Sequence, residues 1–162
     1  MIVQLCRDCL WTYKWEGDRQ TPCLSCDSKQ LTIPTSENLV RTITMLLDRG
    51  IEVSRGSCNI HDVNDDIGYI GKTVQLQIEL GRLYPTVMFQ NLPPGWLLYE
   101  YHSIEDYNTI GPKYTGLSHT NSFVDDDELE FATALTVSNI EVWLKDIDKD
   151  AYKAIWTIVD FL

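Results

Sequence analysis

The sequence lacks any long hydrophobic run. No segment of its 162 residues approaches the roughly 18 consecutive apolar residues that a membrane-spanning helix needs. The N-terminal residues also lack the basic start and the apolar run of a signal peptide, so we expect a cytoplasmic protein. Because disulfides are rare in that compartment, clustered cysteines are expected to bind metal.

Basic residues are scarce. The chain has 13 Lys and Arg against 24 Asp and Glu, which gives a formal net charge of −11. Charges balance within residues 1–34, so all the excess acid lies in residues 35–162. Such a segment is repelled by nucleic acids and anionic membranes and is attracted to basic proteins. The plainer interpretation is that its acidity only keeps the protein soluble.

Common catalytic motifs are also missing. There is no P-loop, no dinucleotide-binding glycine pattern and no nucleophile elbow. Two weaker candidates remain for an enzyme. One is a hydrolase that uses the neighbouring Cys58 and His61, and the other is a carboxylate cluster that binds Ca²⁺ or Mg²⁺, drawn from Asp62, Asp65 and Asp66 or from Asp125, Asp126, Asp127 and Glu128. The plainer interpretations are an inert core cysteine and a solvated acidic surface.

Four of the five cysteines form two Cys-x-x-Cys pairs. Cys6 and Cys9 are followed, after thirteen residues, by Cys23 and Cys26. Each pair suits a tight turn that brings two thiolates onto one ion, and two such turns complete a tetrahedral shell. A Cys₄ shell leaves no position for water or substrate, so the spacing predicts a structural zinc ion, with iron in a redox centre as the alternative.

The residues around these cysteines resemble the small rubredoxin-like zinc ribbons. The matching run reads Cys6-Arg-Asp-Cys9-Leu-Trp-Thr-Tyr-Lys-Trp15, then Arg19, then Pro22-Cys23-Leu-Ser-Cys26. The resemblance covers residues 1–33 and implies a zinc-held module. Leu10 stands where many ribbons carry glycine, and Leu24 where they carry proline.

Zinc ribbons differ in function, and this one is charge-neutral. Trp11, Tyr13 and Trp15 are candidates for base stacking, which gives the hypothesis of a nucleic-acid-binding ribbon. A stacking platform without a basic groove is weak support for that hypothesis. The alternative is that these aromatic residues pack on the cysteine turns and the following domain.

Residues 35–162 predict an α+β domain with an antiparallel or mixed sheet and helices on one face. The apolar spacing of Leu39, Ile43, Leu46 and Leu47 predicts a helix that Gly50 ends. The expected order thereafter is strand 51–53, polar loop 58–66, strand 74–80, a helix or strand at 86–92, a turn at 93–95, strand 96–102, long loop 107–122, strand 129–137, and two C-terminal helices from 138 and 148 onward.

Taken together, the sequence predicts a non-enzymatic zinc-binding protein that binds, and regulates or inhibits, a basic protein partner. The candidate partner-binding residues are Trp11 and Trp15 in the ribbon and the acidic run Asp125, Asp126, Asp127 and Glu128. A sharper version is a phage-type inhibitor that imitates the charge of nucleic acid. It requires the acidic residues to gather on one face.

Overall fold

The computed structural model describes residues 1–14, 21–106 and 109–147, and its strands form one seven-stranded mixed sheet. The strands are β1 (Ile2–Leu5), β2 (Thr12–Lys14), β3 (Ile33–Ser36), β4 (Val53–Asp65), β5 (Gly68–Leu80), β6 (Trp96–Asp106) and β7 (Thr109–Val124). Their order across the sheet is β2-β1-β3-β4-β5-β7-β6. All neighbours are antiparallel except β3 and β4, which pair in parallel at Thr35 and Gly56.

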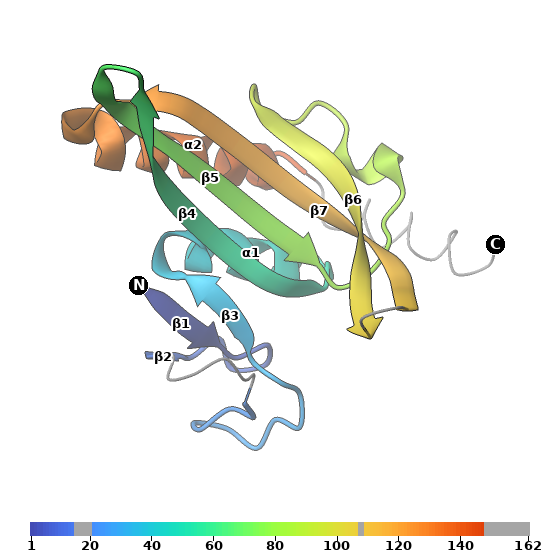
Figure 1. Cartoon of the computed structure of the whole chain (residues 1–162). Coiled ribbons are helices and arrows are strands. Elements are labelled where there is room, and N and C mark those ends of the chain that lie inside the picture. The colour runs from blue at the N-terminus through green and yellow to red at the C-terminus, as the bar shows by residue number, and fades with distance from the viewer. Residues whose placement is uncertain (15–20, 107–108, 148–162) are drawn as a thin grey trace.

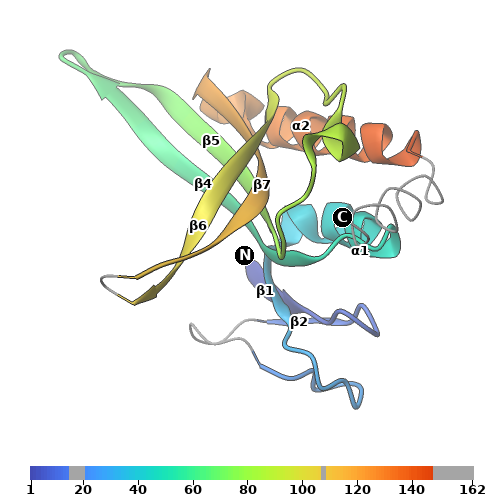
Figure 2. The same ribbon diagram turned by 90° about the vertical axis from the view of Figure 1, so that its right-hand side faces the viewer.

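The helices lie on one face of this sheet, as predicted (Figure 1; Figure 2). They are α1 (Val40–Asp48) and α2 (Leu129–Lys145), with short 3₁₀ turns η1 (Glu37–Leu39), η2 (Thr86–Phe89) and η3 (Asp126–Glu128). Neither long helix has the length and apolar character needed to cross a membrane, within the residues that the structure describes.

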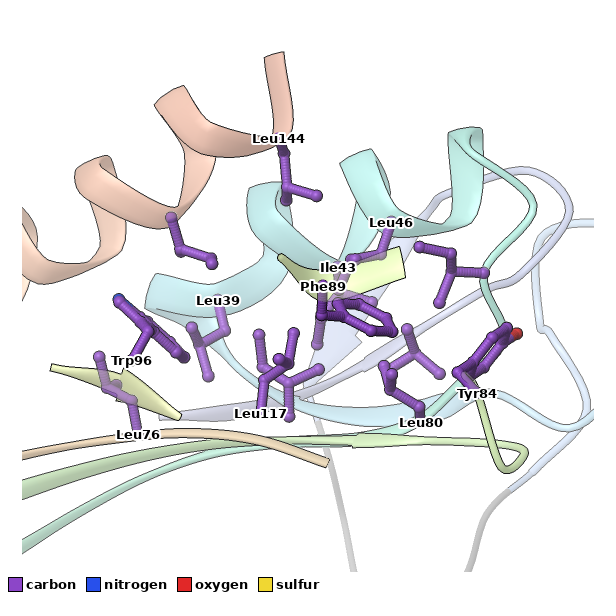
Figure 3. Close-up of a cluster of buried hydrophobic side chains, with 14 of the residues drawn as sticks. Leu39, Ile43, Leu46, Leu76, Leu80, Tyr84, Phe89, Trp96, Leu117 and Leu144 are labelled. Atoms are coloured by element: carbon purple, nitrogen blue, oxygen red, sulfur yellow. The ribbon is translucent and has the colours of Figure 1, made fainter. Parts of the chain in front are cut away.

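The hydrophobic core fills the space between the helices and the sheet (Figure 3). Alternate residues of β5, including Leu76, Ile78 and Leu80, point toward the helices because side chains alternate along a strand. Ile43 and Leu46 of α1 belong to the same core cluster and are fully buried. Leu5 and Ile33 belong to the same core cluster, so strands from the cysteine-bearing segment share in it.

Several predicted elements are confirmed. Helix α1, its end at Gly50 with a φ of 75°, and the alternating strand at 74–80 are all present. The segment whose type was left open, 86–92, contains the 3₁₀ turn η2, and strand β6 begins at Trp96 after the predicted turn. The division into residues 1–33 and 35–162 stays a prediction.

The two predicted loops are wrong. Residues 58–66 lie in β4 almost to their end, and residues 109–122 of the expected long loop lie in β7. Both segments read as loops because they are polar and lack apolar alternation. They form strands because strand pairing satisfies their backbone groups: β4 pairs with β5 from Val53 to Asp65, and β7 lies between β5 and β6.

The strand predicted at 129–137 is also wrong, since these residues begin α2. Their alternating Leu129, Phe131, Thr133 and Leu135 imitated a strand, but Phe131 and Leu135 are exposed. The buried positions of the element are Thr136, Val137, Ile140, Glu141 and Leu144, which follow helical spacing. One helix therefore replaces the predicted strand and the first C-terminal helix. The second predicted helix, from 148, lies outside the described residues.

Candidate metal centre

The four predicted cysteine ligands meet at one point. The Sγ atoms of Cys6, Cys9, Cys23 and Cys26 all lie within 4.8 Å of one another. Cys6 Sγ is 3.6 Å from Cys26 Sγ, and Cys9 Sγ is 3.6 Å from Cys23 Sγ. These separations exceed the ~2.05 Å of a disulfide, and all four residues are free cysteines. The first cysteine of each pair is buried, whereas Cys9 is exposed.

Backbone geometry at each turn directs the thiols inward. The N–H of Cys9 donates to Cys6 Sγ at 3.4 Å, and the N–H of Ser25 donates to Cys23 Sγ at 3.3 Å. The turn after Cys9 is closed by the N–H of Cys6, which donates to the Trp11 carbonyl at 2.9 Å. Leu10 adopts a φ of 59°, the left-handed conformation that favours glycine, at the position where the resembling ribbons carry glycine.

The arrangement fits a tetrahedral thiolate-bound metal ion. A regular tetrahedron with Zn–S bonds of about 2.3 Å has S–S edges of about 3.8 Å, close to the observed 3.6 Å pairs. Thiolates suit zinc and iron alike, so the geometry supports a metal centre without choosing between them. The four sulfur atoms fill a four-coordinate shell and leave no ligand position for a substrate.

The pKa values of the thiols diverge. The backbone N–H of Ser25 contributes most to lowering the pKa of Cys23 to about 7. At Cys26 the backbone N–H of Ser28 favours the thiolate and so lowers the pKa, but desolvation and the three neighbouring cysteines outweigh it and raise the pKa to about 12. Close packing of four thiols therefore disfavours four negative charges, which a bound cation would offset.

Arg7 fastens the first cysteine turn to the main sheet. Its Nη1 donates to the Val53 carbonyl at 2.6 Å, where β4 begins, and its Nε donates to the Leu31 carbonyl at 2.9 Å. Partial burial lowers the pKa of Arg7 from its ordinary value, against the opposing effect of Glu52. The sequence shows that Arg7 lies between Cys6 and Cys9, but it does not show that Arg7 contacts Val53, 46 residues away.

The Cys58–His61 pair proposed for a hydrolase does not form. Both residues lie on β4, where Cys58 pairs with Leu76 and His61 pairs with Thr73 in unbroken register. Residues three apart on a regular strand point to opposite faces of the sheet. Cys58 packs against the core on the helix-covered face, so the imidazole cannot act as its base.

The two acidic runs come to the same end of the molecule. Lys72 Nζ lies 2.6 Å from an oxygen of Asp62 and 4.0 Å from an oxygen of Asp126. In the part of the chain that the structure describes, however, the four cysteines are the only group of at least three ligand side chains placed to hold one ion. The acidic metal cluster considered from the sequence is therefore not formed by the described residues.

Of the two tryptophans predicted to bind a partner, Trp11 lies in the described part of the chain, next to the first cysteine turn. Trp11 is 60% exposed and follows the left-handed Leu10. Trp15 lies outside the described residues.

Comparisons with protein-family models, with curated proteins and with solved structures find no match to this chain. The case for its function therefore depends on the geometry of its own residues.

Proposed function

We propose that the four cysteines bind one structural zinc ion and that the chain is an interaction protein which binds a basic protein partner. The observation that carries the proposal is the convergence of four Sγ atoms within 4.8 Å from two turns thirteen residues apart. A closed thiolate shell gives the ion a structural role, in which it holds the cysteine turns together beside the sheet.

A structural metal ion is favoured because the cysteine turns themselves have little apolar packing. β2 has three residues, and Leu10, Trp11, Leu24 and Leu31 are exposed around the cysteine turns. A small segment that leaves its apolar side chains in solvent is typically held by a metal ion. The zinc ion would therefore supply much of the free energy that fixes the turns.

A matched pair of variants tests the metal site. Cys26→Ser removes one of the four thiols, and Cys58→Ser removes the one cysteine outside the cluster. Elemental analysis should find one zinc per chain in the wild type and in Cys58→Ser, and much less in Cys26→Ser. Equal zinc content in the two variants would show that the cluster is not the site.

The interaction role is supported by the distribution of charge. All the excess acid lies in residues 35–162, and the two acidic runs gather at one end of the sheet around Lys72. Complementary charge speeds association and selects the partner, so this end suits a protein with a basic surface. An inhibitor that imitates nucleic acid is the sharper version of the same proposal, since it requires acidic residues to lie together on one part of the surface.

Native mass spectrometry of the chain purified from its own host tests this role. A basic protein that copurifies at low salt, and dissociates as the salt concentration rises, is the expected result. If nucleic acid copurifies instead, and Trp11→Ala releases it, the ribbon is the binding element and the interaction proposal is wrong.

A further inference from the structure

An exposed apolar surface lies at the turn between β4 and β5. Ile67 at the tip of this hairpin is 95% exposed, and Tyr69 and Ile70, which follow it, are also exposed. Phe131, in the first turn of α2, is 72% exposed. Single exposed apolar residues need no explanation, but several at one end of a molecule mark an interaction site. We call these four residues the hairpin-end surface.

The local structure holds these side chains outward. The carboxylate of Asp65 accepts hydrogen bonds from the N–H groups of Ile67 and Gly68, at 2.8 and 3.1 Å, and so fixes the hairpin turn. The hydroxyl of Tyr69 donates to the carboxylate of Asp126 in η3. That contact joins the hairpin to the start of α2, and Figure 1 shows the two at the same end of the molecule.

A cavity of about 560 Å³ opens between these two elements. One wall consists of Tyr69, Ile70 and the backbone of Gly71, and the other is formed by the acidic run Asp125, Asp126, Asp127 and Glu128. An apolar wall facing carboxylates suits a long basic side chain, whose aliphatic stem packs while its charged end reaches the acids.

The protein already holds one cation in this manner. Lys72 Nζ lies 5.6 Å from the centre of the Tyr69 ring while it contacts Asp62 and Asp126. Asp125, Asp127 and Glu128 make no ion pair with any residue in the described ranges. The acidic wall of the cavity beside the hairpin-end surface therefore has carboxylates that can pair with cations of another molecule.

We infer that the hairpin-end surface and its cavity bind a segment of a partner protein that is rich in Lys and Arg and carries apolar side chains on one face. A basic side chain enters the cavity, and the apolar side chains cover Ile67 and Phe131. Charge complementarity selects this occupant, because the same carboxylates repel nucleic acid and anionic membrane. The inference rests on the proposed function, for which it names the surface and the chemistry of the partner.

A synthetic amphipathic helix of lysine and leucine serves as the probe, and its binding to the zinc-loaded full chain is measured by fluorescence anisotropy at low salt. The test variant is Asp125→Asn, Asp127→Asn, Glu128→Gln. The control variant removes the same charge elsewhere through Glu37→Gln, Glu100→Gln and Asp146→Asn. Asp125 makes no side-chain capping bond, so its substitution leaves the start of η3 intact. A second pair tests the apolar contact, with Ile67→Ser against Leu97→Ser, where Leu97 is an exposed leucine on β6.

We expect the test variant to weaken binding about tenfold or more and its charge-matched control less than about twofold. Ile67→Ser should weaken binding more than Leu97→Ser. Equal weakening by both charge variants would overturn the inference and leave the proposed basic partner in place, because the attraction would then follow net charge alone. Failure of the wild type to bind the probe at low salt would contradict the proposed function as well.

Discussion

Replacing Arg7 with alanine should loosen the cysteine-bearing segment from the sheet. The guanidinium donates to the Val53 carbonyl at 2.6 Å in a half-buried position and to the Leu31 carbonyl at 2.9 Å nearer the surface. A hydrogen bond from a charged donor contributes about 1.5–3 kcal/mol when partly buried and less when exposed. We therefore expect Arg7→Ala to lower the free energy of unfolding by about 2–3 kcal/mol.

Urea unfolding of the zinc-loaded protein, followed by circular dichroism, measures this change. Arg55→Ala is the control, because Arg55 is an exposed arginine on the same strand as Val53. The control should change stability by less than about 0.5 kcal/mol. Arg7→Lys should recover only part of the loss, since an ammonium group lacks the planar fork that spans two carbonyls. An Arg7→Ala effect as small as that of the control would refute this account of Arg7.

Three further predictions follow from backbone strain, packing and ionisation. Leu10→Gly should stabilise the protein by about 1 kcal/mol in the same urea assay, because the φ of 59° strains leucine but not glycine; no gain would contradict the strain. Gly56→Ala should lower the free energy of unfolding by about 1–3 kcal/mol, because the added Cβ would lie 2.3 Å from Ile43 Cδ1. Adding Ile43→Val, which removes that methyl group, should restore part of the loss, and additive effects of the two substitutions would argue against the clash. Burial, with a contribution from Glu79, raises the pKa of Tyr99 to about 12; since the unfolded side chain ionises near 10, stability should fall between pH 10 and 12, and Tyr99→Phe should reduce that fall in pH-dependent unfolding.

The elements that the sequence predicted correctly are those whose burial follows a simple period. Leu39, Ile43 and Leu46 share one face around α1, and apolar residues alternate along β5 from Val74 to Leu80. In each case the apolar pattern alone indicates which face of the element is buried. The cysteine cluster was predictable for a similar reason, because two Cys-x-x-Cys turns need only a short hairpin between them.

The elements that were predicted wrongly depend on contacts between residues distant along the chain. The polar stretch of β4 from Cys58 to Asp65 is a strand because β5 pairs with it throughout, which no local pattern in β4 indicates. In α2, the alternation that includes Phe131 and Leu135 suggested a strand, but both side chains are exposed. The segment is a helix whose buried residues include Ile140 and Leu144. The cavity beside the hairpin-end surface was not predictable for the same reason, since Tyr69 and Asp126 in its two walls are 57 residues apart.

X-ray absorption spectroscopy of the purified full chain tests the central claim most directly, because it reports both the metal and its ligands. The account predicts a zinc edge with four sulfur ligands at about 2.3 Å, with no nitrogen or oxygen ligand. An iron edge would show that the cysteines form a redox centre. A shell containing oxygen or nitrogen, or a protein purified without metal, would contradict a closed structural zinc site at Cys6, Cys9, Cys23 and Cys26.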